Sequence, residues 1–148
     1  MPTAPTTVDA GSLASRLRLS VTRVSRTLRR EGAGAEISPT LMSALATVER
    51  HGPMTVGELA THEQVQKPTV TRIVAALQER DLVARTPDPL DGRISWLEAT
   101  GQGRRLLQRV RRRRDEYLAA RLKRLSPDEL ETLERAAELL ERLTEAGP

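Results

Sequence analysis

Two short stretches of the sequence hold side chains suited to binding nucleic acid. Residues 66–72 read QKPTVTR, and residues 88–93 read DPLDGR. Lysine and arginine bind phosphates, arginine also binds base edges, and threonine hydroxyls can do either. The two aspartates near an arginine could instead hold its guanidinium group or offer carboxylates to a cation. The choice depends on the elements that carry the two stretches.

Other chemistries lack the residues that they need. The chain of 148 residues has no cysteine, which excludes a disulfide framework, a thiol nucleophile and a thiol-oxidation switch. We interpret His51 and His62 as turn and surface residues, and Asp88 with Asp91 provides too few oxygen ligands for a metal site. The sequence shows no nucleophile–base pair and no phosphate-binding loop. We therefore expect no enzyme, no cofactor and no metal.

Charge and hydropathy limit the class of protein. No apolar run approaches the ~20 residues that cross a bilayer, and the N-terminus lacks the basic start and apolar core of a secretory signal. We expect a soluble, cytoplasmic protein without a membrane partner and with a flexible arm at residues 1–9. The net charge of +4 is compatible with a nucleic-acid partner.

Helical signals dominate the first half of the chain. An apolar stripe at three- and four-residue steps predicts a helix over about 10–31; its members are Leu13, Leu17, Val21, Val24 and Leu28. Ser38-Pro39 starts a second helix, which ends at His51-Gly52-Pro53. The capping box T-V-G-E at 55–58 starts a short third helix that ends near Glu63.

A fourth helix and a hairpin carry the two polar stretches. The helix runs from about 66 to 80 and has apolar residues on one face: Val70, Ile73, Val74 and Leu77. Strands at 82–86 and 94–99 flank a loop at 87–93, and this hairpin is the candidate wing. Trp96 is expected in the core at the base of this wing. Two short helices with a tight turn, followed by a hairpin, make a winged helix-turn-helix over about 38–99. The fold class is mainly α with a small β wing.

Two long helices complete the chain over about 100–146. Thr100 caps the first, and the capping box at Ser126 to Glu129 starts the second. The arginine run 111–114 covers all sides of one helical turn, so its side chains do not form a single basic surface. We expect some of these arginines to pair with the last helix, within the chain or across a dimer, rather than with DNA: Glu131, Glu134, Glu138 and Glu141.

In a winged helix-turn-helix, both polar stretches would contact DNA. In this motif the fourth helix would lie in the major groove, and the wing would reach the backbone or the minor groove. An arginine at the wing suits the concentrated negative potential of a narrow minor groove. Arg93 is then the side chain that the loop places in the minor groove. The alternative is an ordinary surface arginine paired with Asp88 or Asp91.

Four motifs in this order resemble the MarR (multiple-antibiotic-resistance regulator) family of bacterial transcriptional regulators. They are TVGELA (55–60), VQKPTVTRIVAALQERDLVAR (65–85), DPLDGR (88–93) and ATGQGRRLL (99–107). The resemblance covers about 10–146 as one domain. It implies an obligate homodimer built by the helices at about 10–31 and 100–146, with these interface residues: Leu13, Leu17, Leu133, Leu140 and Leu143.

The resemblance also assigns the residues that meet DNA. On the fourth helix they are Lys67, Pro68, Thr69, Thr71 and Arg72. Arg93 is the wing-tip reader, Asp88 and Asp91 support the wing, and Asp91 holds Arg93 by a charge-assisted hydrogen bond. Three departures from the family pattern stand out: Leu90 replaces an arginine between the aspartates, Gln66 replaces a capping serine, and Pro68 removes a backbone donor.

These observations predict a homodimeric transcriptional regulator that represses by binding a pseudo-palindromic operator in double-stranded DNA. Whether a small aromatic or phenolic effector releases it stays open, because a chain without phenylalanine has few rings to stack on a ligand. Two other functions stay open as well. One is an architectural DNA-binding protein with little sequence preference, and the other is a helical protein-interaction module.

Overall fold

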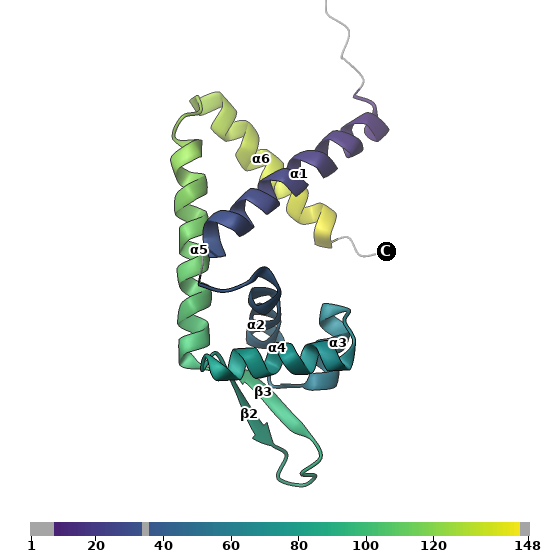
Figure 1. The fold of residues 1–148 in the computed structure, drawn as a ribbon. Helices are drawn as coiled ribbons and strands as arrows, with labels where there is room; N and C mark the ends of the chain where they lie inside the picture. Colours follow the sequence, from purple (N-terminus) through teal and green to yellow (C-terminus); the bar gives the residue numbers. More distant parts are fainter. Residues whose placement is uncertain (1–7, 34–35, 146–148) are drawn as a thin grey trace, which may run out of the picture. The chain divides into compact units, whose positions relative to one another are not determined.

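The computed structural model describes residues 8–33 and 36–145, so residues 1–7 of the expected arm lie outside the described part. The chain forms two compact units, one up to Arg114 and one from Asp115 onward. The described ranges contain six helices and three strands (Figure 1), which confirms the predicted fold class. No helix in these ranges is both long and apolar enough to cross a membrane.

The first four helices begin and end close to the predicted residues. They are α1 (Ala10–Ala33), α2 (Pro39–His51), α3 (Val56–Glu63) and α4 (Lys67–Glu79). At α3 both halves of the capping box form, because Glu58 N–H donates to Thr55 Oγ1 at 3.2 Å and Thr55 N–H donates to Glu58 Oε2 at 2.7 Å. Ser38 Oγ caps α2 by accepting from the N–H of Leu41. These bonds satisfy donors that a helix start would otherwise leave open.

A three-stranded antiparallel sheet of order β1–β3–β2 carries the wing. The long pair is β2 (Val83–Pro87) and β3 (Ser95–Ala99), each starting one residue later than predicted. The strand β1 (Met54–Thr55) pairs with β3 and was not predicted. Two residues are too few to show an alternating pattern, so no sequence signal marked this strand.

One hydrophobic core joins α4 to the sheet. The predicted inward face of α4 is buried, and it belongs to a cluster that includes Leu45 of α2, Leu59 of α3 and Leu97 of β3. Fully burying one such side chain stabilises the fold by about 1.5–3 kcal/mol. The core therefore keeps α4 and the hairpin together as one packed lobe.

The helix α5 (Gly101–Leu122) starts in the first unit, where Leu107 and Val110 are buried. The second unit holds the rest of α5 and α6 (Pro127–Glu145). The predicted capping box forms here too, because Ser126 N–H donates to Glu129 Oε2 at 2.8 Å and Glu129 N–H donates to Ser126 Oγ at 3.3 Å.

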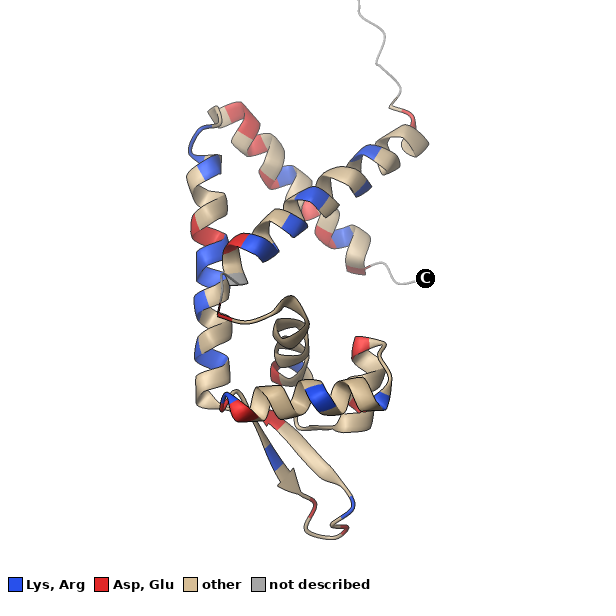
Figure 2. Ribbon diagram, viewed as in Figure 1, with Lys and Arg blue, Asp and Glu red and all other residues tan. Residues whose placement is uncertain are grey.

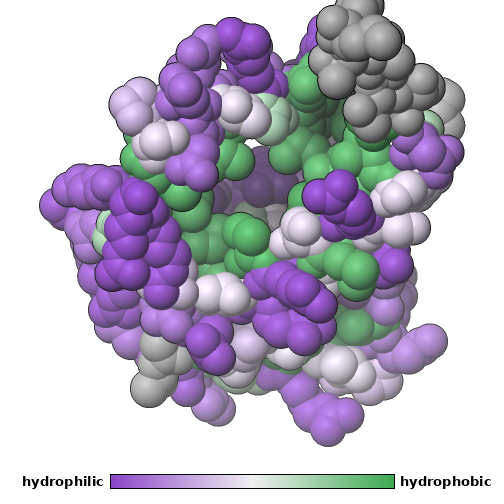
Figure 3. Space-filling model, turned by 90° about the horizontal axis from the view of Figure 1, so that it is seen from above, coloured by the Kyte–Doolittle hydropathy of each residue, from purple (hydrophilic) through white to green (hydrophobic). Residues whose placement is uncertain are grey.

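Large apolar side chains on α1 and α6 stay open to solvent in the single chain. No residue of α6 is buried, and Leu133 and Leu140 are 45% and 37% exposed. On α1, Leu13 and Leu17 are 40% and 36% exposed. Apolar surface is open to solvent in the space-filling view from above (Figure 3).

Candidate nucleic-acid interface

The start of α4 presents polar groups to solvent. Lys67, Pro68, Thr71 and Arg72 are exposed, and Thr69 is half-buried. Gln66 at the N-cap makes no side-chain capping bond, and the first turn has no acidic residue. The partial positive charge of this helix start is therefore not neutralised by its own side chains, which suits an anion such as a phosphate.

Arg72 and Thr71 differ in whether their side-chain hydrogen-bond donors are free to bind a ligand. Among the described residues, the Arg72 guanidinium has no hydrogen-bond or ion-pair partner. It lines a shallow hollow between α4 and the start of α2, beside Thr69 and Leu41. Thr71 Oγ1 instead donates to the carbonyl oxygen of Lys67 at 2.9 Å. Arg72 thus offers its donors outward, whereas the Thr71 proton is used inside the helix.

The wing loop between β2 and β3 is organised around the carboxylate of Asp88. Asp88 Oδ1 accepts the N–H groups of Leu90 and Asp91 at 2.8 and 2.9 Å. Asp88 Oδ2 accepts the indole Nε1–H of Trp96 at 2.8 Å. Because these donors favour the charged carboxylate, the Trp96 bond foremost, the pKa of Asp88 lies below its ordinary value.

A second carboxylate holds the arginine of the loop. Arg93 Nε donates to Asp91 Oδ1 and Arg93 Nη2 to Asp91 Oδ2, both at 3.0 Å. This two-point pairing lowers the pKa of Asp91 below its ordinary value. The Arg93 side chain is nevertheless 91% exposed. A guanidinium has five N–H donors, so the Nη1 donors stay directed away from the carboxylate.

The bonding of Arg93 agrees with one of the two alternatives from the sequence, a surface arginine paired with Asp91, and its contact with DNA stays a prediction. The side chain also presents unused donors. Figure 2 shows basic positions on α4 and on the wing, within the lobe that the common core holds together.

Comparison with known proteins identifies the family. Residues 37–95 match the model of the MarR family. An uncharacterised HTH-type transcriptional regulator of Mycobacterium bovis is 40% identical over 136 residues, which cover 92% of this chain and 95% of that protein. The chain belongs to the MarR family. This membership confirms the resemblance, and it makes the protein a helix-turn-helix transcriptional regulator rather than an enzyme.

Further relatives and solved structures agree with the MarR fold. The HTH-type transcriptional repressor MdtR of Bacillus subtilis is 28% identical over 75% of this chain and 70% of its own. A putative transcriptional regulator from Pseudomonas aeruginosa is similar in structure, with a TM-score of 0.80, 29% identity and coverage of 92% of this chain and 96% of that one. A MepR mutant from S. aureus bound to an oligodeoxyribonucleotide has a TM-score of 0.70 at 20% identity, covering 91% and 98% of the two chains.

Trp96 has a different place from the one expected of it. The sequence predicts a place for it in the core of the wing base, but Trp96 is only half-buried and its indole Nε1–H donates to Asp88. The register pairs Trp96 with Thr86, two residues before Asp88, which brings the indole within reach of the carboxylate. A sequence pattern reveals such a cross-strand bond only when the register is known.

Two arginines of the run in α5 pair within the first unit. Arg111 Nη2 lies 3.0 Å from Glu49 Oε2, and Arg113 Nη1 lies 3.2 Å from Glu36 Oε2. The expected pairing with the last helix is therefore wrong for these two side chains within the chain. Acidic partners far away in sequence, on α2 and just before it, gave no local signal. Pairing of the run across a dimer stays a prediction.

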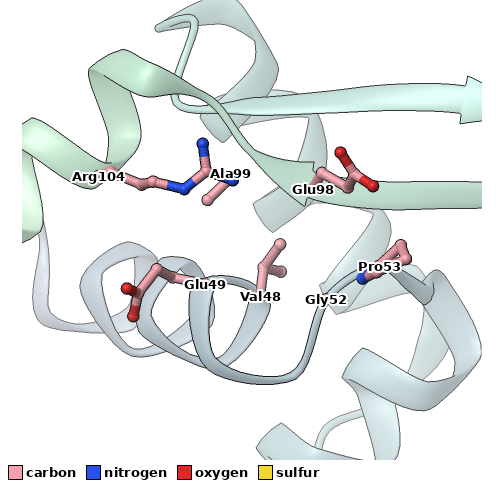
Figure 4. Close-up of a pocket in the computed structure, with 7 residues that line it drawn as sticks. All are labelled: Val48, Glu49, Gly52, Pro53, Glu98, Ala99 and Arg104. Carbon is pink, nitrogen blue, oxygen red and sulfur yellow. The ribbon is translucent and has the colours of Figure 1, made fainter.

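Two histidines stack on each other away from α4 and the wing tip. The ring centroids of His51 and His62 lie 4.6 Å apart, at the ends of α2 and α3. Both residues are exposed, as expected. A small polar pocket is lined by Glu49, Glu98 and Arg104 among others (Figure 4). Within the described ranges, no group of three or more His, Cys, Asp or Glu side chains could hold a metal ion.

Proposed function

We propose that this MarR-family protein is a cytoplasmic, homodimeric repressor that binds a pseudo-palindromic operator in double-stranded DNA. The observation that carries the proposal is the exposure of two arginines on one lobe. Arg72 has no partner among the described residues, and Arg93 keeps free donors while Asp91 fixes its position.

In this proposal α4 is the reading helix, and the α4 of each subunit enters one major groove. Lys67, Pro68, Thr69, Thr71 and Arg72 would face the DNA, with Arg72 best placed for a base edge or a phosphate. Arg93 would enter the adjacent minor groove, where a narrow groove concentrates negative potential. Two lobes related by a twofold axis would read half-sites about one helical turn apart, ~34 Å. The repressor name of the relative MdtR and the DNA-bound MepR structure of the same fold support this function.

The dimer would cover the leucines that are open to solvent on α1 and α6: Leu13, Leu17, Leu133, Leu140 and Leu143. Exposed apolar side chains in a repeating helical stripe are typical of an association surface. A small aromatic or phenolic effector would act by binding one spacing of the two lobes more tightly than another. A ligand screen that measures release of the bound operator would identify such an effector.

Fluorescence anisotropy on the DNA upstream of the protein's own gene tests the proposal, with excess unrelated duplex and at two salt concentrations. Selection from a random duplex pool covers the case of a distant operator. We expect competition-resistant binding that weakens with salt and loses at least about tenfold in affinity in Arg72→Ala. Arg142→Ala, in the last turn of α6, is the matched control and should bind as the unaltered protein does.

The other outcomes distinguish the rival functions. Equal affinity for all duplexes would favour an architectural protein. No binding to any duplex and no enriched sequence in the selection would contradict DNA recognition and favour a protein-interaction module.

A further inference from the structure

The most exposed large apolar side chain described in this structure stands at the tip of the wing. Leu90 is 96% exposed, whereas Ile94 at the base of the same loop is 38% exposed. A single exposed leucine is ordinary on a protein surface. Leu90 differs because of the way in which the loop holds it.

The backbone on both sides of Leu90 is fixed by hydrogen bonds. Asp88 Oδ1 accepts the N–H groups of Leu90 and Asp91, while Trp96 holds the other oxygen of the same carboxylate. Asp88 N–H donates to the carbonyl oxygen of Ile94 at 2.9 Å and closes the loop. Pro89 adds a fixed φ. The side chain is therefore presented on an ordered backbone, so that little further ordering is needed when it meets a surface.

The surroundings of Leu90 define what kind of surface it can meet. The hairpin projects beyond α4 within its lobe (Figure 1), and the loop also carries Arg93, whose free donors need acceptors. Leu90 itself has no polar side-chain atom, and its neighbour Pro89 has none either. The tip thus combines one hydrogen-bonding cation with an apolar side chain three residues away.

The minor groove of DNA offers a matching pair of features. A·T pairs expose only acceptors there, whereas G·C pairs add the N2 amino donor of guanine. Arginine can donate to the acceptors, but leucine cannot accept from the amino group. A leucine packed against a G·C pair would bury that donor unpaired, which is unfavourable. Apolar side chains of other proteins, leucine among them, do enter the minor groove, where they insert between base steps.

We infer that Leu90 is a specificity-determining residue, which packs in the minor groove beside Arg93 and rejects G·C pairs at the positions under the wing. The inference rests on the proposed function, because it needs the wing to lie on DNA. Leu90 does not supply affinity through charge. It determines which base pairs the wing tolerates.

Base analogues test this assignment at single groups. In the selected operator, the A·T pairs protected by the wing are replaced by G·C or by inosine·C, which lacks the N2 amino group. We expect the unaltered protein to lose about tenfold in affinity on G·C and to recover on inosine·C. Leu90→Ala should bind all three duplexes within about threefold of one another, with dimer mass and helicity unchanged. Ile94→Ala, an apolar truncation on the same hairpin, should keep the discrimination.

Three results would overturn the inference. The first is equal binding of the unaltered protein to G·C and inosine·C duplexes. The second is full discrimination retained in Leu90→Ala. The third is a loss of affinity when deoxyuridine replaces thymidine under the wing, which would place Leu90 on a thymine methyl in the major groove. Binding of the unaltered protein to no duplex at all would instead overturn the proposed function and this inference together, so the two failures are distinguishable.

Discussion

Two aspartates of one short loop perform different tasks. Asp88 organises the backbone by accepting two N–H groups and the indole of Trp96. Asp91 orients the guanidinium of Arg93 through two parallel bonds. Each carboxylate accepts these hydrogen bonds best in its charged form, so we expect the wing to be sensitive to acid.

The only tryptophan of the chain reports on the loop directly. Donors depress the pKa of Asp88 below its ordinary value of 3.8 in the folded protein. Its stabilising contribution is therefore complete above that ordinary value and is lost as pH falls through the lower folded-state pKa. We expect the Trp96 emission to change with a midpoint below 3.8. Far-UV circular dichroism at each pH monitors the helices.

Single carboxylate substitutions assign that transition. Asp88→Asn should abolish the acid-induced change of emission, whereas Asp91→Asn should retain it. An unaltered titration curve in Asp88→Asn would show that the Trp96–Asp88 bond does not control the loop.

Arg93 and Asp91 should differ in what they contribute to DNA binding. Arg93→Ala removes the donors themselves, and we expect operator affinity to fall at least about tenfold and the salt dependence of binding to become shallower. Asp91→Asn keeps the arginine but loses the charge-assisted clamp, so a smaller loss is expected. Anisotropy titrations at several salt concentrations measure both quantities. A greater loss in Asp91→Asn than in Arg93→Ala would contradict the positioning role.

At the scale of elements, the contact of α5 with Leu82, the residue before β2, leaves no room for a side chain at Gly103. A Cβ built there would lie 2.2 Å from the carbonyl oxygen of Leu82 and 3.1 Å from Leu45 Cδ1. Since the close atom belongs to the backbone, α5 would have to shift. We expect Gly103→Ala to lower the free energy of unfolding by about 1–3 kcal/mol, as overpacked cores do. Urea denaturation at fixed protein concentration measures the change.

Gly101 of the same helix provides the matched control. A Cβ there meets only the Nη1 atom of Arg105, the end of a flexible side chain, at 3.3 Å. Gly101→Ala should therefore be neutral or slightly stabilising, by about 0.4–1 kcal/mol. Equal destabilisation by both substitutions would indicate a general effect of alanine at the helix start.

The same elements show what a sequence reveals and what it hides. Helix starts were predictable because caps such as Thr55–Glu58 act within four residues, and the buried face of α4 followed from its periodicity. The motifs around Lys67 and Arg93 supplied the proposed DNA-facing positions, which stay a prediction. The strand β1, the Trp96–Asp88 bond and the Arg111–Glu49 pair depend on chain segments that meet only in the folded state. The spacing of residues within one segment does not reveal such long-range contacts.

At the scale of the whole molecule, the proposed operator recognition requires two lobes joined by one interface. The apolar stripe of α6 is solvent-exposed in the single chain, and burial of each leucine in a dimer would be favourable by about 1.5–3 kcal/mol. Linking two half-site contacts in one molecule raises the overall affinity well beyond that of one lobe. The dimer interface is thus expected to be as important for DNA binding as the reading helix.

Charges placed on this stripe should separate the subunits and weaken DNA binding at the same time. In Leu133→Asp/Leu140→Asp, two carboxylates would have to be desolvated at the interface, so light scattering coupled to size exclusion should give the monomer mass. Operator affinity should fall by more than tenfold, because each half-site is then bound alone. Arg135→Asp is the control, since at ~100° per residue it adds the same charge on the opposite face of α6. Circular dichroism confirms that helices persist. A dimer mass for the double variant at the same concentration would place the interface elsewhere, and a monomer that binds the operator undiminished would mean that one lobe suffices.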